Sequence, residues 1–376
     1  MKKIQMVDLK SQYLVIKNEI DEAINNVINN TSFINGPSVK YFQDDLEKYL
    51  GVNHVIPCAN GTDALQISLM SLGLSPGDEV ITSDFTFAAT VEVISLLGLT
   101  PVLVDVDENS FNINPKEIEK AITEKTKVII PVHLFGQSAE MDEILKIAKK
   151  NNLFVIEDNA QGIGAKYSSL NGKKYMTGTM GDVSATSFFP SKNLGAYGDG
   201  GAIFTNDDDL AHSMRGIVNH GMYQRYYHDV VGVNSRLDSI QASVLKIKLK
   251  YLDFYNERRK ESALRYTELL NNNSNIIAPK VIFNCDSHVF HQYTLRIVNH
   301  DREGLVKYLN ENQIPCGIYY PVPLHSQKAY KSTRYNEDNF KVTNQIVKEV
   351  VSLPMHSELS VEQIYFITSH ILKFLN

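Results

Sequence analysis

One lysine stands in a setting that can support covalent chemistry. Lys192 lies in the segment Ser187–Gly195, directly after an apolar run and just before the glycine-rich turn Gly198–Gly201. A lysine held at the end of a buried strand can have a lowered pKa, and its free amine then attacks carbonyl groups. Most lysines in loops are simply solvated, so Lys192 taken alone favours that simpler interpretation.

A carboxylate occupies a comparable position. Asp158, in the segment Ile156–Gln161, closes another apolar run that we expect to be a strand. A carboxylate buried there stays ionised only when a cation meets it, such as a metal ion or a protonated ring nitrogen. An aspartate that caps the next helix is the alternative. From Asp158 alone, the two interpretations carry equal weight.

Two further segments could recognise parts of a ligand. In Ala59–Gln66, Gly61 lets the backbone approach an anion and Thr62 adds a hydroxyl at a helix N-terminus, a combination typical of phosphate sites. A plain helix cap is the alternative. Phe87, in Phe85–Thr90, could stack on a flat ring, although a core phenylalanine is the commoner outcome.

These four features together indicate one cofactor. A phosphate cradle, a stacking aromatic, a carboxylate for a ring nitrogen and an aldehyde-capturing lysine are the parts that a pyridoxal 5'-phosphate (PLP) site needs. All four follow predicted strands. Because ligands of α/β sheets bind at the carboxyl ends of the strands, we expect the four to meet in one crevice.

The elements that must position these residues form an α/β pattern. Short runs rich in Val and Ile alternate with segments of helical periodicity, which favours a mostly parallel sheet of seven strands. The expected strands are His54–Pro57, Glu79–Thr82, Pro101–Val106, Lys127–Val132, Leu153–Glu157, Val183–Phe188 and Gly201–Thr205.

The pattern changes near residue 240. We expect one long helical run from Leu237 to about Leu270, then a smaller α/β segment with a strand at His291–Val298, a helix near Asp301–Asn312 and a closing helix whose capping box begins at Ser360. The sequence therefore predicts a large domain at 1–240 and a small C-terminal domain at 241–376.

Composition excludes several classes of protein. The chain has 43 acidic and 37 basic residues and a net charge of −6, which is no footprint for nucleic acid. No apolar run approaches the roughly 20 residues of a membrane helix. The widely spaced Cys58, Cys285 and Cys316 offer no disulfide framework and no metal site, so we expect a cytoplasmic protein without a metal.

Several of these motifs, in this order, resemble one family. Asn60–Leu65, Glu157–Gln161, Ser187–Lys192 and Gly198–Gly201 are similar to motifs of the DegT/DnrJ family of PLP-dependent nucleotide-sugar aminotransferases, and the resemblance runs nearly end to end. It implies a fold-type I aminotransferase and a homodimer whose active sites are shared across the interface. Some relatives with histidine in place of the lysine are dehydratases, so Lys192 favours transamination.

The resemblance also implies roles for individual residues. Lys192 would bind the cofactor aldehyde and shuttle a proton, while Asp158 would hold the ring nitrogen protonated. Gln161 would contact the ring or its 3-hydroxyl and Phe87 would stack on it. Ser187, with Gly61 and Thr62, would hold the phosphate, together with Asn234 of the neighbouring subunit.

The implied reaction takes an amine from L-glutamate to the keto group of a nucleotide-linked sugar, in bacterial surface glycan biosynthesis. Similarity is greatest to the branch that aminates C3 of UDP-2-acetamido-2-deoxy-3-oxo-glucuronate. There Arg236 would bind the uronate carboxylate, although it could equally pair with Asp238 or contact phosphate. The loop from Tyr319 through Tyr320 to His325 would contact the substrate.

One departure keeps the substrate open. Tyr319 stands where the uronate branch has histidine, so a dTDP-3-keto-6-deoxyhexose 3-aminotransferase is the alternative. From other classes, we also consider a non-catalytic PLP-binding regulator and a nucleotide-binding oxidoreductase, whose closest glycine string, Gly162–Lys166, lacks the third glycine. His133 could approach the site, but a satisfied histidine at a strand end is the better expectation.

Overall fold

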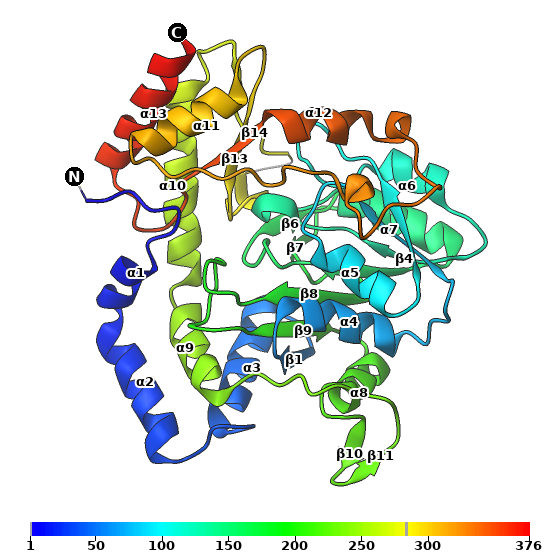
Figure 1. Cartoon of the computed structure of the whole chain (residues 1–376). Coiled ribbons are helices and arrows are strands. Elements are labelled where there is room, and N and C mark those ends of the chain that lie inside the picture. The colour runs from blue at the N-terminus through cyan, green and yellow to red at the C-terminus, as the bar shows by residue number, and fades with distance from the viewer. Residues whose placement is uncertain (1, 283–284) are drawn as a thin grey trace.

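A seven-stranded sheet forms the centre of the chain (Figure 1). The computed structural model describes residues 2–282 and 285–376. In the sheet order β1-β9-β8-β5-β4-β2-β3, β9 runs antiparallel to both neighbours and all other pairs are parallel. The strands are β1 (His54–Cys58), β2 (Glu79–Ser83), β3 (Thr100–Val104), β4 (Thr126–Ile130), β5 (Phe154–Asp158), β8 (Val183–Ser187) and β9 (Gly201–Thr205). All seven predicted strands are confirmed, with ends that differ by two residues at most.

Helices cover both faces of this sheet. One face packs against α4, α5 and α8, and the opposite face packs against α6 and α7, with α3 and α9 near β1 and β9. The helices of the chain as far as α9 are α1 (Leu9–Val15), α2 (Lys17–Asn29), α3 (Pro37–Leu50), α4 (Gly61–Ser71), α5 (Ala89–Leu96), α6 (Pro115–Ala121), α7 (Met141–Asn151), α8 (Asp208–Ile217) and α9 (Ser239–Leu249).

Alternation along the strands decides which residues face which helices. On β5, Val155 belongs to the core under α6 and α7, whereas Ile156 belongs to the core under α4, α5 and α8. Successive strand residues point to opposite faces. Glu157 therefore shares the side of Val155, and Asp158 shares the side of Ile156.

The single long helix expected from Leu237 to Leu270 is wrong. Two helices occupy this stretch, α9 and α10 (Leu252–Leu270), separated by Lys250 and Tyr251. Short-range backbone bonds close the end of α9, from the Lys250 N–H to the Ile247 oxygen and from the Tyr251 N–H to the Lys248 oxygen. α9 packs on α2 and α3, whereas α10 packs on α13, so the chain must turn between two separate cores. Helical periodicity continues on both sides and gives no sign of the break.

The C-terminal part has its own three-stranded antiparallel sheet, β12-β13-β14, and its own apolar core. Its elements are β12 (Ile276–Ile277), β13 (Tyr293–Ile297), α11 (Arg302–Glu311), α12 (Lys341–Glu349), β14 (Val350–Leu353) and α13 (Val361–Leu375). The capping box at Ser360 is confirmed, since its hydroxyl accepts from the Gln363 N–H and the Gln363 side chain accepts from the Ser360 N–H. Ile4, near the N-terminus, packs into the same core. The domain division near residue 240 stays a prediction.

Two short hairpins and several single turns escaped prediction because they lack apolar periodicity. They are β6 (Lys166–Ser168) with β7 (Lys174–Met176), β10 (Met222–Gln224) with β11 (Tyr227–His228), and the 3-10 turns η1 (Leu134–Gly136), η2 (Cys285–Ser287), η3 (Leu324–Ser326) and η4 (Glu337–Phe340). Among residues 2–282 and 285–376, no helix combines the length and apolar character needed to cross a bilayer.

Candidate active site

A cavity of about 720 Å³ opens at the carboxyl ends of the central strands. Several elements meet there: the start of α4, the segment between β2 and α5, the ends of β5 and β8, and the C-terminal segment around residue 320. The predicted site residues that line it are Gly61, Thr62, Phe87, Asp158, Gln161, Ser187, Lys192, Tyr319 and Tyr320. The chain thus brings most of the candidate residues into one crevice.

The start of α4 forms one wall of the cavity. Asn60 caps this helix, with its side-chain oxygen accepting from the Asp63 N–H at 2.8 Å. A Cβ atom on Gly61 would lie 2.6 Å from the Ser187 Cβ, so only glycine allows β8 and α4 to come this close. The N–H groups of Gly61 and Thr62 have no acceptor within the part of the chain that the structure describes. Free N–H groups at a helix N-terminus favour an anion.

Asp158 is buried at the far end of β5. Its Oδ2 accepts a hydrogen bond from the Thr90 hydroxyl at 2.8 Å, and its Oδ1 accepts from the Ala160 N–H at 3.1 Å. Burial raises the pKa of Asp158, against the opposing effects of Thr90, the Ala160 amide and the Lys192 charge. A protonated ring nitrogen placed beside this carboxylate would stabilise its ionised form. Thr90 ends the segment Phe85–Thr90, but no sequence pattern indicates that its hydroxyl donates to Asp158.

Lys192 projects from the loop that follows β8. Burial lowers the pKa of its ammonium to about 8, although the Asp158 charge works in the opposite direction. The loop is held firmly: the Lys248 ammonium donates to the Gly195 oxygen, and the Asn193 amide donates to Asn256 Oδ1 at 2.7 Å. A lysine with this pKa carries an appreciable fraction of free amine at neutral pH, as a nucleophile requires.

Gln161 and the aromatic residues form the opposite wall. The Gln161 side-chain oxygen accepts from the Phe135 N–H at 2.7 Å, and its amide donates to the Tyr320 hydroxyl at 3.2 Å. Phe87 is 59% exposed, and its ring centre lies 6.2 Å from that of Tyr320. An exposed aromatic at the mouth of a cavity offers a surface on which a planar ligand can stack.

Three candidate residues do not line the cavity. Asn234 is exposed and follows the β10–β11 hairpin, while Arg236 is half-buried nearby. His325 is buried, and its ring contacts Asp84 and Glu337. The roles expected for these three residues stay predictions.

Other residues line the cavity without having been assigned a site role. Ser191 precedes Lys192, and Asp199 lies in the glycine-rich turn Gly198–Gly201. Their closeness to Lys192 in the sequence could have indicated that they line the same cavity. His291, from the small α/β segment, is buried in the wall, and its Nδ1 has no hydrogen-bond partner within residues 2–282 and 285–376. No local pattern marks His291, because it reaches the cavity only through the packing of distant segments.

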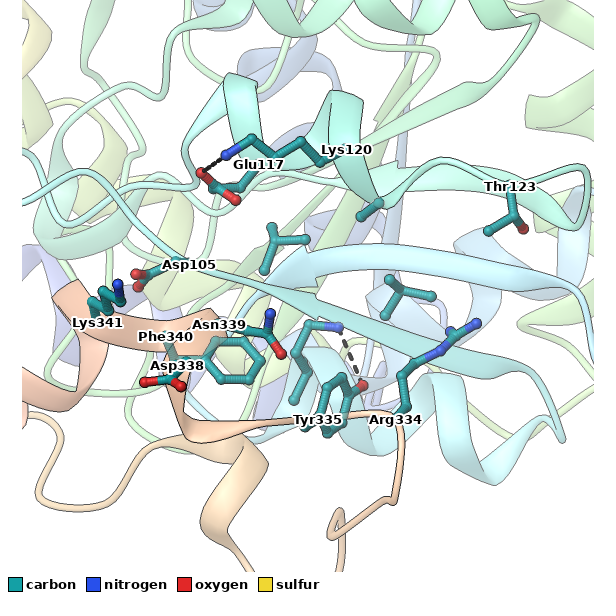
Figure 2. Close-up of a pocket in the computed structure, with 14 residues that line it drawn as sticks. Asp105, Glu117, Lys120, Thr123, Arg334, Tyr335, Asp338, Asn339, Phe340 and Lys341 are labelled. Atoms are coloured by element: carbon teal, nitrogen blue, oxygen red, sulfur yellow. Dashed lines mark hydrogen bonds and ion pairs between the residues drawn. The ribbon is translucent and has the colours of Figure 1, made fainter.

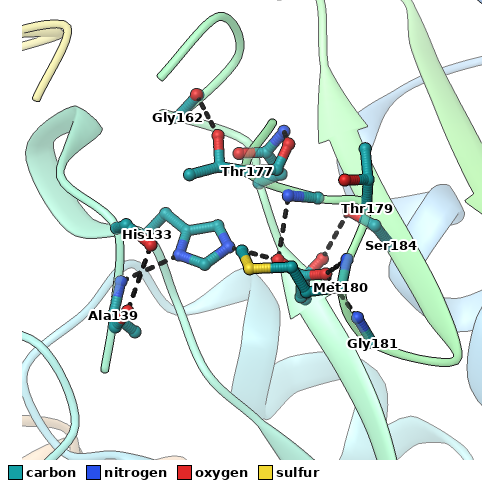
Figure 3. Close-up of polar contacts among 12 residues, drawn as sticks. His133, Ala139, Gly162, Thr177, Thr179, Met180, Gly181 and Ser184 are labelled. Carbon is teal, nitrogen blue, oxygen red and sulfur yellow. Dashed lines mark hydrogen bonds and ion pairs between the residues drawn. The ribbon is translucent and has the colours of Figure 1, made fainter. Parts of the chain in front are cut away.

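His133 takes part in a closed network on the other side of β5 (Figure 3). Its Nε2 lies 2.8 Å from Glu157 Oε2, and its Nδ1 accepts from the Ala139 N–H at 3.1 Å. Glu157 also accepts from the N–H groups of Gly178, Met180 and Gly181. Both ring nitrogens are occupied, so His133 is the satisfied histidine that was the better expectation.

A second cavity, of about 680 Å³, lies between β3, α6 and the segment that precedes α12 (Figure 2). Its polar groups are largely paired within the chain. The Lys120 ammonium donates to Glu117 at 2.7 Å, and the Tyr335 hydroxyl accepts from the Leu103 N–H at 3.2 Å. Within residues 2–282 and 285–376, no group of three or more His, Cys, Asp or Glu side chains is arranged to hold a metal ion.

Comparison with known proteins agrees with the geometry of the first cavity. The model of the DegT/DnrJ/EryC1/StrS aminotransferase family matches residues 15–372. Among solved structures, a DegT DnrJ EryC1 StrS aminotransferase from Brucella abortus superposes with a TM-score of 0.94 and 42% identity, covering 99% of this chain and 100% of that one. NtdA from Bacillus subtilis, with bound cofactor PMP, has a TM-score of 0.90 and 30% identity over 100% of this chain and 86% of that one.

Curated relatives are similar over nearly their whole length. A pleiotropic regulatory protein of Geobacillus stearothermophilus is 46% identical over 99% of this chain and 98% of its own length. UDP-2-acetamido-2-deoxy-3-oxo-D-glucuronate aminotransferase of Pseudomonas aeruginosa is 44% identical over 97% and 98%. dTDP-3-amino-3,6-dideoxy-alpha-D-galactopyranose transaminase of Aneurinibacillus thermoaerophilus is 42% identical over 96% of both chains.

The alternatives from other classes find no support here, because the family model and most of these relatives are aminotransferases. The structure agrees with an aminotransferase, since it has the fold-type I architecture, a lysine after β8 and a carboxylate at the end of β5. The chain belongs to the DegT/DnrJ/EryC1/StrS aminotransferase family and is an enzyme of the sugar aminotransferase kind.

Proposed function

We propose that this chain is a PLP-dependent aminotransferase that moves an amino group from L-glutamate to the C3 keto group of a nucleotide-linked sugar. The observation that carries the proposal is the pairing of Lys192, whose pKa burial lowers to about 8, with the buried Asp158 in one cavity. A nucleophilic amine opposite a carboxylate suits a cofactor with an aldehyde and a basic ring nitrogen.

The residues present fit the cofactor. Gly61 and Thr62 offer N–H groups that have no acceptor among the described residues, next to the Ser187 hydroxyl, and these groups would hold the phosphate. Asp158 would hold the proton of the ring nitrogen, while Phe87 would cover one ring face and Gln161 would lie near the 3-hydroxyl. When bound, PLP supplies an aldehyde that exchanges amines and a conjugated ring that accepts an electron pair.

The remaining chemistry falls to side chains of this chain. The Lys192 Nζ would bind the cofactor at rest and, once displaced by the amine of the donor, would carry the proton between carbon atoms. Thr90 and the Ala160 amide orient Asp158, so its carboxylate needs no rearrangement during the reaction. Hydrogen bonds from Asn193 and to the Gly195 oxygen hold the loop of Lys192 and so restrict the positions that its Nζ can reach.

For the sugar, we favour UDP-2-acetamido-2-deoxy-3-oxo-glucuronate. Support comes from the identity of 44% to the Pseudomonas aeruginosa enzyme of that name. Arg236 lies outside the cavity of its own chain, so the contact of its guanidinium with the uronate carboxylate stays a prediction. The dTDP-3-keto-6-deoxyhexose alternative is supported by the 42% identity to the dTDP-sugar transaminase and by Tyr319 at the position where the uronate branch has histidine.

The active form would be a homodimer. Asn234 is exposed and does not line the cavity of its own chain, which suits a residue that reaches the phosphate of a neighbouring copy. Phe87 and Phe189 also line the cavity while 59% and 52% exposed. A second chain would cover these rings, since a site open on this side would admit water to the reacting atoms.

The visible absorption spectrum tests the proposal most directly. A band from lysine-bound cofactor should appear when PLP is added, and excess L-glutamate should convert it to the spectrum of the amine form. UDP-linked and dTDP-linked 3-keto sugars, each added to that amine form, should then restore the original band at different rates, and the faster one identifies the nucleotide. A band that glutamate leaves unchanged would overturn L-glutamate as donor. If PLP produced no band, the aminotransferase proposal would fall.

A further inference from the structure

His325 holds a position different from the one expected of a substrate contact. It is 6% exposed, and both of its ring nitrogens face carboxylates: Nδ1 lies 2.6 Å from Asp84 Oδ2, and Nε2 lies 3.2 Å from Glu337 Oε2. The His325 N–H donates to Asp84 Oδ1 at 2.7 Å, and the Leu324 N–H donates to the Asp84 backbone oxygen at 3.1 Å. Two hydrogen bonds thus join His325 to Asp84, 241 positions away in the sequence, and a third joins the neighbouring Leu324 to Asp84.

The carboxyl group of Asp84 is buried and therefore needs hydrogen-bond donors. Asp84 directly follows β2 and is fully buried, and this burial raises the pKa of its carboxyl group to about 6 despite the opposing effect of His325. Each carboxylate oxygen takes one N–H of His325, in the side-by-side arrangement that makes charge-assisted bonds strong. A buried carboxylate without these donors would be costly.

The joined segments lead directly into the active site. After Asp84 the chain continues through Phe85 to Phe87, and before His325 it comes from Tyr319 and Tyr320. The ring of Phe85 lies 5.9 Å from that of Tyr320 at an angle of 71°, and Phe87 lies 6.2 Å from Tyr320. The two segments therefore run together, joined at one end by Asp84 and His325 and opening at the other end onto the cavity.

The C-terminal side of His325 is fastened as well. Its ring stacks on Phe340 with centres 4.3 Å apart, and the Tyr335 hydroxyl accepts from the Leu103 N–H and donates to the Pro101 oxygen on the edge strand β3 (Figure 2). By contrast, nearly all of residues 326–334 are exposed. On the C-terminal side of the two tyrosines, Asp84 is accordingly the first buried polar anchor, whereas on their N-terminal side Gly317 pairs with Ser352 through two backbone hydrogen bonds.

We infer that Asp84 and His325 form a clip that positions Tyr319 and Tyr320 as a fixed wall for the nucleotide-linked sugar. Both are positioning residues, since neither lines the cavity. The inference rests on the proposed function. Lys192 and Asp158 are held by other contacts, from Lys248, Asn193 and Thr90, so loss of the clip should disturb the wall and leave the reacting centre in place.

Two substitutions of the same residue test the clip. The Asn side chain in His325→Asn can place its amide where Nδ1 lies and still donate to Asp84, whereas His325→Gln places its amide nearer to Nε2. We expect His325→Gln to raise KM for the keto sugar about tenfold, the loss that one charge-assisted hydrogen bond implies. Conversion of the visible band by glutamate should stay within about threefold of the wild type. His325→Asn should recover most of the KM, and the exposed Lys331→Gln, on the neighbouring segment, should match the wild type.

Hydrogen exchange gives a readout that does not depend on turnover. In His325→Gln, amides of residues 319–325 should exchange at least about tenfold faster, while those of the Lys192 loop should not change. Equal behaviour of the Asn and Gln variants, equal slowing of both half-reactions, or unchanged exchange at 319–325 would each overturn the clip. If His325→Gln does not fold, Asp84→Asn, which keeps the size and one acceptor, serves in the same measurements. A wild-type protein that fails to react with glutamate would contradict the proposed function, yet hydrogen exchange would still decide about the clip.

Discussion

Two adjacent carboxylates on β5 show how one strand serves two purposes. Glu157 faces the core under α6 and α7, where His133 and three backbone N–H groups saturate it (Figure 3). Asp158 faces the cavity, where Thr90 and one backbone N–H leave it open to a further partner. Burial pushes both pKa values upward, but the donors around Glu157 bring its pKa below the ordinary range, whereas the pKa of Asp158 stays raised.

The number of hydrogen-bond partners distinguishes a structural carboxylate from one that can bind a ligand. A buried carboxylate with all acceptor positions filled stabilises the fold and has nothing left for a ligand. A buried carboxylate with too few hydrogen-bond donors is poorly stabilised in its ionised form, and a protonated ring nitrogen beside it would stabilise that form. The same test distinguishes His133, with both ring nitrogens occupied, from His291, which lines the cavity and whose Nδ1 has no partner in the described part of the chain.

Loss of the lysine on the cavity side should have the largest effect. Lys192→Ala removes both the amine that captures the cofactor and the group that carries the proton, so the turnover rate should fall by about 10³-fold or more. Stability should change little, since the half-buried side chain of Lys192 has no hydrogen bond within the described residues, and the bond from its backbone N–H to the Phe189 oxygen is kept in the variant. Steady-state turnover and urea denaturation measure the two quantities. A variant that retains a tenth of the wild-type rate would contradict the assignment.

The closed side should respond in the opposite way. Glu157→Gln removes one partner of a buried pair, so the free energy of unfolding should drop by about 3–5 kcal/mol. The pKa of Glu157 is lowered in the folded state, so its contribution is present at neutral pH and is lost as the pH falls through that pKa. Urea denaturation at neutral and acidic pH measures both. The folded fraction should still bind PLP, and a variant that folds normally but loses the cofactor band would break the comparison.

Much of this arrangement could be predicted from sequence because local patterns specify it. The seven strands follow from apolar runs, and Lys192, Asp158 and Gly61 lie at or within a few residues after the carboxyl ends of strands. The break between α9 and α10 could not be predicted, because both halves keep a helical pattern and only the two cores distinguish them. The contact between His325 and Asp84 could not be predicted, because nothing near His325 in sequence indicates that Asp84, 241 residues away, takes its N–H groups.

The pH dependence of PLP binding should report the pKa of Lys192 on the cavity side of β5. Only the free amine of Lys192 attacks an aldehyde, and burial lowers its pKa to about 8. The rate at which the cofactor-free protein regains its visible band should therefore rise about tenfold per pH unit below 8, and level off above it. Stopped-flow absorbance from pH 6 to pH 10 measures this rate. A rate that still rises steeply near pH 10 would mean that Lys192 titrates as an ordinary lysine.

The smallest expected effect concerns Thr90, the residue that orients Asp158. Thr90→Val keeps the shape but removes the hydroxyl that donates to Asp158 Oδ2, so the dissociation constant of PLP should rise roughly threefold to tenfold, the usual net contribution of one hydrogen bond. That hydroxyl also lowers the pKa of Asp158. Without it the carboxylate protonates at a higher pH, so the deficit should grow as the pH falls.

A threonine on the closed side provides the matched control. Thr177 donates to the Gly162 oxygen, and Thr177→Val removes a hydroxyl of the same kind without touching Asp158. It should lower stability and leave the dissociation constant of PLP unchanged at every pH. Titration of the visible band at pH 6 and pH 8 compares the two variants. If both weakened PLP binding equally, the two sides of β5 would be one coupled network, because a structural hydroxyl would then influence the site as strongly as one that touches the carboxylate.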